Sequence, residues 1–66
     1  MSTLTAHELP DYAKERDVAA YTGISAPTLR RRRAEGLPPT YIKIGSAVRY
    51  PKTQLLQWLT SLAEAG

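Results

Sequence analysis

The hydrophobic pattern predicts a first helix over residues 14–22. This segment, KERDVAAYT, contains good helix formers, and Val18, Ala19 and Tyr21 make a short apolar stripe. Gly23 follows directly and suits the left-handed position at which many helices end. We therefore expect a short helix that stops at this glycine.

A second helix is predicted to begin almost immediately. Ser25 is a good N-cap, Pro27 is tolerated in the first turn, and a tract of four arginines continues the helix to Gly36. Only Gly23 and Ile24 separate the two helices, and Ile24 offers an apolar side chain to bury in the corner. Two short helices joined this closely are typical of a helix-turn-helix.

A β-hairpin is predicted over residues 40–50, a segment rich in β-branched and aromatic residues around Gly45. A two-residue turn would separate its two isoleucines from Val48 and Tyr50, whereas a three-residue loop over residues 45–47 puts all four side chains on one face. We expect the three-residue loop, because it lets all four apolar side chains face a core. The isoleucines are Ile42 and Ile44.

A third helix is predicted after the hairpin. Pro51 suits its first turn, and an apolar face that can cover a core recurs at helical spacing in Leu55, Trp58, Leu59 and Leu62. Residues 1–11 show no apolar periodicity, which is typical of a flexible N-terminal arm. The expected fold is therefore a small α+β winged helix-turn-helix over residues 12–66, with two short helices, a β-hairpin wing and a C-terminal helix.

Positive charge concentrates in the middle of the chain. The formal net charge is only +3, but residues 25–52 hold seven basic residues and one acidic residue, whereas the rest of the chain holds two basic and five acidic residues. The expected hairpin register also sets Lys43 opposite Arg49, a like-charge pair that destabilises a hairpin unless an anion lies against it. This distribution favours a polyanionic partner.

The sequence offers little for catalysis or metal binding. Its 66 residues make one domain at most, too small for a deep active-site cleft. It has no cysteine, His7 has no partners at ligand spacing, and no carboxylate pair, Ser/His/Asp set or phosphate-binding glycine loop is present. We expect no catalytic residue, cofactor, metal or small-molecule substrate, and no enzymatic activity. Without a leader pattern or a membrane-length apolar stretch, a cytoplasmic protein with no membrane contact is expected.

The order and spacing of these segments resemble the AlpA and excisionase-type winged helix-turn-helix proteins, which are similar to the DNA-binding half of MerR regulators. The resemblance spans residues 12–59, through DVAAYTGIS, TLRRRRAEGLPP, YIKIGSAVRYP and QLLQWL. It implies that residues 25–35 enter the major groove of double-stranded DNA. It also implies that the wing, residues 41–50, contacts a neighbouring minor groove or its phosphates.

Three features depart from the pattern of these proteins. Lys14 stands where many relatives have a threonine or serine cap, so the first helix is expected to start loosely. Arg32 occupies a position that is often apolar, so its stem either snorkels across the core edge or projects outward. The dimerising coiled coil of MerR regulators does not follow, and we expect a monomer in isolation.

The four arginines cannot all face one groove, because consecutive helical residues turn by about 100° each. With Leu29 buried, the opposite face of the second helix carries Pro27, Arg30, Arg31 and Ala34, with Thr28 at its margin. We expect Arg30 and Arg31 to contact the groove, since arginine can donate two hydrogen bonds to guanine. Arg33 lies one turn beyond Leu29 and is expected to reach phosphate.

Other candidate contacts flank the second helix. Ser25 caps it, and whether this serine also contacts a phosphate stays open. In the wing, phosphate or minor-groove contact is expected from Lys43, Ser46 and Arg49. Trp58 and Tyr50 are assigned to the core, which argues against base stacking on a single strand.

The resemblance implies an excisionase, a recombination directionality factor of a phage or integrative element. Such a protein binds attachment-site DNA cooperatively with further copies of itself, bends it, and directs an integrase towards excision in the bacterial host cytoplasm. A transcriptional regulator of the AlpA kind is an alternative with the same fold and contacts. An alternative of another class is a protein-interaction module that docks on an acidic partner.

Overall fold

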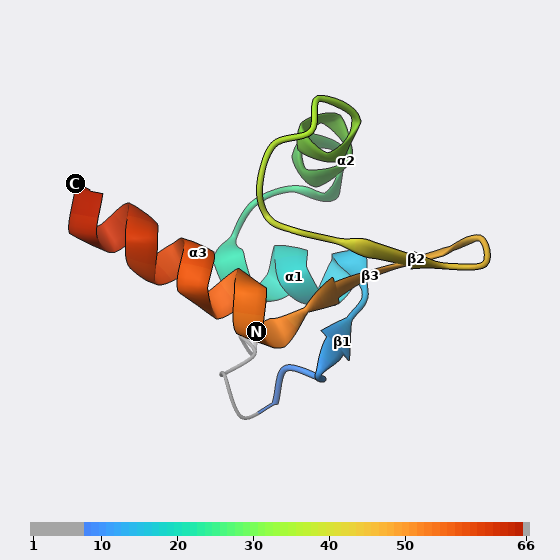
Figure 1. The fold of residues 1–66 in the computed structure, drawn as a ribbon, viewed down its shortest axis with the longest axis horizontal. Helices are drawn as coiled ribbons and strands as arrows, with labels where there is room; N and C mark the ends of the chain where they lie inside the picture. Colours follow the sequence, from blue (N-terminus) through green and yellow to red (C-terminus); the bar gives the residue numbers. More distant parts are fainter. Residues whose placement is uncertain (1–7, 66) are drawn as a thin grey trace.

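A computed structural model describes residues 8–65 (Figure 1). Along the chain its elements are β1 (Tyr12–Ala13), α1 (Glu15–Thr22), α2 (Ala26–Ala34), β2 (Ile42–Ile44), β3 (Ala47–Pro51) and α3 (Lys52–Ala65). The strands pair antiparallel in the order β1-β3-β2. Within the described residues this is a small α+β winged helix-turn-helix, which confirms the predicted fold.

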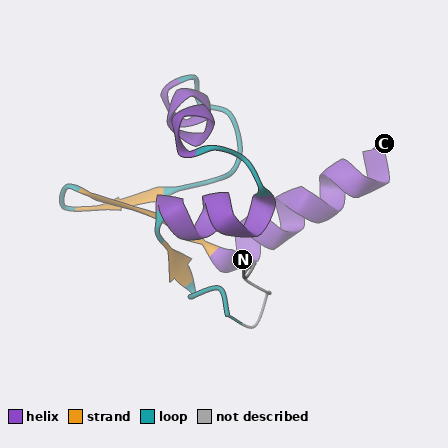
Figure 2. Ribbon diagram, turned by 180° about the vertical axis from the view of Figure 1, so that it is seen from behind, coloured by secondary structure: helices purple, strands orange, loops and turns teal. Residues whose placement is uncertain are grey.

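The wing and α3 project from the body of the molecule in different directions. In Figure 1, α2 stands above α1, the β2–β3 hairpin extends to one side, and the C-terminal end of α3 extends to the other. The view from behind shows the same separation (Figure 2). The hairpin tip and the last turns of α3 therefore lie at opposite ends of the molecule.

The helix-turn-helix is shaped by local hydrogen bonds at its turn. Gly23 adopts a φ of 79°, and its N–H donates to the Ala19 carbonyl at 2.9 Å, so α1 ends where the sequence predicted. The Thr22 hydroxyl accepts a hydrogen bond from the N–H of Ile24 at 3.1 Å. Ser25 is the N-cap of α2, as predicted, and its hydroxyl accepts from the N–H of Thr28 at 3.3 Å.

The start of α1 lacks a side-chain cap from its N-cap residue, Lys14. A lysine has only donors and cannot accept from the free N–H groups of the first turn. The Asp17 carboxylate makes the reciprocal contact, accepting from the backbone N–H of Lys14 at 3.3 Å. Glu15 and Asp17 also place negative charge in this first turn, where the helix dipole favours it.

The hairpin register differs from the expected one. Its loop contains two residues, Gly45 and Ser46, because Ile44 pairs with Ala47 across the turn. The prediction of a three-residue loop over residues 45–47 was wrong. Gly45 adopts a φ of 63° at the first central position, where a type II′ turn needs a positive φ and glycine adopts it without steric cost.

This register changes the composition of the two faces of the wing. Lys43 pairs with Val48, and Arg49 pairs with Ile42, so the predicted Lys43–Arg49 pair does not form. Ile42 and Ile44 are 36% and 59% exposed. Their expected burial fails because the hairpin tip extends beyond the core (Figure 1), so no packed surface is available there.

Described residues before position 12, the domain boundary expected from the sequence, also belong to the packed domain. Leu9 is 2% exposed and belongs to the core, and the N–H of Lys52 donates to the Asp11 carbonyl at 2.8 Å. The strand β1, which the sequence pattern did not predict, places a fully buried Ala13 opposite Tyr50. The last residues of the expected arm therefore pack onto the domain, and residues 1–7 lie outside the described residues.

Almost every element contributes one or two side chains to the core. Among the described residues its fully buried apolar side chains are Leu9, Ala13, Val18, Leu29, Tyr50 and Leu55. Trp58 and Leu59 of α3 pack against this cluster, whereas Leu62 is 51% exposed. The apolar face of α3 thus covers the core along its first turns only, which corrects the expectation for Leu62.

Two leucines of α3 provide a matched test of this packing. We predict that Leu55→Ala lowers the free energy of unfolding by about 2–5 kcal/mol, because it removes a fully buried side chain and leaves a cavity. The same change at the exposed Leu62 should alter stability by less than about 0.5 kcal/mol. Urea unfolding followed by circular dichroism at low temperature measures both. Equal losses would contradict the assignment of Leu62 to the surface.

Candidate nucleic-acid interface

The exposed face of α2 lies opposite its one fully buried residue, Leu29. At helical spacing the residues that point away from Leu29 are Pro27, Arg30, Arg31 and Ala34, and all four are exposed. Thr28 is half-buried at the margin. The structure therefore exposes together the helix residues that the sequence analysis grouped as a groove-facing surface.

The four arginines of α2 have four different environments. Arg31 is exposed, and its side chain makes no hydrogen bond or ion pair with any described residue. Arg32 instead folds back over the domain, because its Nε donates to the Pro38 carbonyl at 2.6 Å and its guanidinium lies 5.3 Å from the ring centroid of Trp58. Of the two outcomes considered for Arg32, snorkelling across the core edge is the one observed.

Arg33 joins three elements. Its Nη1 donates to Oε2 of Glu15 in α1 at 3.0 Å and to the hydroxyl of Tyr50 in β3 at 2.9 Å. Its guanidinium also lies 5.7 Å from the ring centroid of Tyr41. The hydrogen bond to Glu15, followed by that to Tyr50, raises the pKa of Arg33 above its ordinary value, against a smaller opposing effect of desolvation. These contacts engage the side chain that the sequence analysis expected at a phosphate.

Arg30 shares the same carboxylate but remains open to solvent. Its Nη1 lies 3.0 Å from Oε1 of Glu15, and its side chain is 55% exposed. Glu15 therefore bridges Arg30 and Arg33 with its two oxygens, while its own side chain is 21% exposed. Sequence reasoning missed this role of Glu15, because the two arginines lie 15 and 18 residues away along the chain.

The N-terminus of α2 is exposed at Ser25. The serine hydroxyl is engaged twice, as acceptor from the N–H of Thr28 and in a 2.8 Å contact with the hydroxyl of Thr28. Both contacts are local to the helix start. They show capping, and phosphate contact by Ser25 stays a prediction.

The wing carries its basic residues on two faces. Lys43 and Ser46 are exposed, whereas Arg49 is half-buried and its Nη1 donates to the carbonyl of the neighbouring Val48 at 2.8 Å. Since Lys43 pairs with Val48, it lies on the face opposite that of Arg49. The three predicted wing residues thus surround the hairpin, and an anion could be held from either side.

The aromatic side chains are mostly structural. Tyr50 is 1% exposed and Trp58 packs against the core, as predicted. Tyr41, which was not singled out from the sequence, is 36% exposed and its ring centroid lies 6.4 Å from that of Tyr50. Tyr41 thus contacts both the guanidinium of Arg33 in α2 and the ring of Tyr50 in β3.

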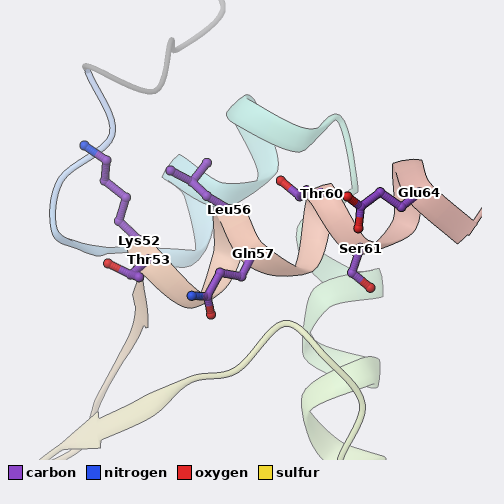
Figure 3. Close-up of a pocket in the computed structure, with 7 residues that line it drawn as sticks. All are labelled: Lys52, Thr53, Leu56, Gln57, Thr60, Ser61 and Glu64. Atoms are coloured by element: carbon purple, nitrogen blue, oxygen red, sulfur yellow. The ribbon is translucent and has the colours of Figure 1, made fainter.

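A surface hollow runs along α3 (Figure 3). It is lined by Lys52, Thr53, Leu56, Gln57, Thr60, Ser61 and Glu64. One lysine and one glutamate make this strip neutral overall, in contrast to α2 and the wing. The candidate interface on α2 and the wing is therefore basic, whereas the α3 strip is neutral.

Comparison with known families agrees with the observed fold. The Helix-turn-helix domain family matches residues 15–63, and the chain belongs to this family. Membership supports DNA binding. Searches of the curated proteins and of the solved structures gave no significant match.

Two further expectations concern membranes and metals. None of the helices within residues 8–65 is both long and apolar enough to cross a membrane. In the same residues no three His, Cys, Asp or Glu side chains gather into a group that could hold a metal ion. His7, for which no metal role was expected, lies outside the described residues.

The different environments of Arg31 and Arg33 predict different effects on stability. Arg33→Gln should lower the free energy of unfolding by about 1–2 kcal/mol, because it breaks charge-assisted hydrogen bonds between three elements. Arg31→Gln, which removes the same charge from an exposed position, should change it by less than about 0.5 kcal/mol. Thermal unfolding of the two variants beside the parent tests this. A loss at Arg31 as large as at Arg33 would refute the structural role of Arg33.

Proposed function

We propose that this protein binds double-stranded DNA sequence-specifically, with α2 in the major groove and the wing against the adjacent backbone. The observation that carries the proposal is Arg31, whose side chain is exposed on the outer face of α2 and makes no hydrogen bond or ion pair with any described residue. Its neighbours Arg32 and Arg33 are held by the domain. An arginine in this position can donate two hydrogen bonds to guanine O6 and N7.

The rest of the proposed interface surrounds Arg31. Arg30 reads bases beside it, and the remaining helix contacts come from Pro27, Thr28 and Ala34. Ser25, at the N-terminus of α2, suits a phosphate. Phosphate or minor-groove contacts of the wing come from Lys43, Ser46 and Arg49. We leave Arg33 out of this interface, because its guanidinium already joins α1, α2 and β3.

We further propose that the protein is an excisionase, an architectural factor without catalytic chemistry of its own. The resemblance of its segments to excisionase-type proteins supports this role. One helix and one wing can neutralise few phosphates, so high affinity at physiological salt requires several copies or a second protein such as an integrase. Neighbouring copies can also offset the roughly 1–6 kcal/mol needed to bend 20–30 base pairs of DNA.

Gel-shift titrations of three variants test the DNA-binding surface. Arg31→Ala should reduce the preference for the specific site by about 5- to 150-fold, which corresponds to one bidentate arginine–guanine contact. Arg49→Ala should weaken binding to all duplexes and lower the slope of log K against log salt by about one unit. Lys52→Ala removes a positive charge from the α3 strip and should preserve the preference for the specific site (Figure 3).

The same assay on duplexes tiled across an attachment site and its integrase gene separates the candidate roles. Cooperative, laddered shifts confined to an attachment-site arm are expected of an excisionase. A shift at a promoter alone would identify a transcriptional regulator. If no duplex gives a salt-sensitive shift, the proposal of DNA binding is overturned and docking on an acidic protein is favoured.

A further inference from the structure

We propose that Glu15 sets the sequence specificity of the interface by positioning Arg30, and that it limits the general affinity for DNA by keeping Arg33 away from the phosphates. This inference rests on the function proposed above. Glu15 lies at the start of α1, outside the exposed face of α2, and holds one arginine with each carboxylate oxygen at 3.0 Å. It therefore acts on two of the four arginines without itself facing the groove.

The contact with Arg30 restricts this side chain without using up its donors. Glu15 takes one hydrogen bond from Nη1 of Arg30. The Nε and Nη2 groups of Arg30 make no hydrogen bond with any described residue. Two N–H groups of a planar guanidinium are what a guanine edge accepts. Arg30 can therefore bind guanine while it stays paired with Glu15, in an orientation fixed beforehand.

The contact with Arg33 has the complementary effect. Arg33 is 21% exposed and is also held by the hydroxyl of Tyr50. With this low exposure and with Nη1 donating to both Glu15 and Tyr50, Arg33 is held against the domain and away from phosphate contacts, which would strengthen binding to every DNA sequence equally. The negative charge of Glu15 also repels the DNA backbone. Both effects weaken binding to every sequence alike, so the specificity itself comes from the positioning of Arg30.

Stability alone does not account for the Glu15–Arg30 pair. Arg30 is 55% exposed, and ion pairs at such exposed positions contribute little to folding. Arg33 and Tyr50 already connect α2 to the sheet without Arg30. The second oxygen of Glu15 is thus directed to an arginine whose role lies on the exposed face of α2.

The test compares Glu15→Gln with Glu35→Gln on the preferred duplex and on a scrambled duplex of equal length. Glu35 is exposed at the end of α2, and its carboxylate makes no hydrogen bond or ion pair with any described residue, so its variant removes the same charge without breaking a contact to an arginine. For Glu15→Gln we expect tighter binding to the scrambled duplex, with a salt slope steeper by about one unit. Its specificity ratio, which is the affinity for the preferred duplex divided by the affinity for the scrambled duplex, should fall about fivefold or more. Glu35→Gln should tighten binding to both duplexes alike and leave the ratio unchanged.

A second set of variants separates positioning of Arg30 from a general effect on the fold. Glu15→Gln should no longer change the specificity ratio in an Arg30→Gln background, although any effect on stability through Arg33 persists there. Arg30→Lys retains the charge and leaves the Glu15–Arg33 contact in place, and should lower the ratio in an otherwise intact domain. Circular dichroism establishes that each variant is folded at the temperature of the assay.

Failure of this inference is distinguishable from failure of the proposed function. The parent protein must first bind its preferred duplex. If the specificity ratio of Glu15→Gln then equals that of the parent or that of Glu35→Gln, only the role of Glu15 is overturned. The role of Glu15 is also overturned if Glu15→Gln lowers the specificity ratio as much in the Arg30→Gln background as in the parent. If the parent binds no duplex at all, the proposed function is overturned and this inference with it.

Discussion

The hydrogen bonds of Arg33 to Glu15 and Tyr50 are the interaction on which the arrangement of this domain depends. They join α2, the proposed recognition helix, to α1 and to β3 of the wing. A domain of this size buries a small core, so apolar packing alone leaves the orientation of a nine-residue helix weakly determined. Directional, charge-assisted hydrogen bonds add the missing geometric definition.

This junction also places the arginines of α2 in different environments. Two of its members fold back onto the domain, one over Trp58 and one against Glu15 and Tyr50. The other two stay on the exposed face, and one of these is also paired with Glu15. A run of like charge that would repel itself on an isolated helix is therefore partly neutralised within the fold. Within residues 8–65, the guanidinium of the tract that has no hydrogen-bond or ion-pair partner is that of Arg31.

Local signals in the sequence were sufficient for the helices. The stop at Gly23 and the cap at Ser25 depend on residues within one turn, and such short-range preferences can be read directly. The assignment of Tyr50 and Trp58 to the core followed from periodicity and is confirmed. The exposed face of α2 followed equally from the burial of Leu29.

Features that depend on the three-dimensional arrangement were not predictable in this way. The hairpin register was argued from burial of Ile42 and Ile44, but the wing extends past the core and the two-residue turn at Gly45 determines the pairing. The strand β1 has only two residues, too few for a visible alternation. The position of Glu15 between two arginines arises only when α1 packs against α2, so no spacing rule along the chain reveals it.

The most direct test of the central claim is an NMR titration of the labelled protein with its preferred duplex. If α2 and the wing form the interface, amide shifts should change along residues 25–34 and 43–49. The α3 strip around Gln57 and Ser61 should remain unaffected (Figure 3). Shifts concentrated on α3, with α2 unchanged, would contradict the account.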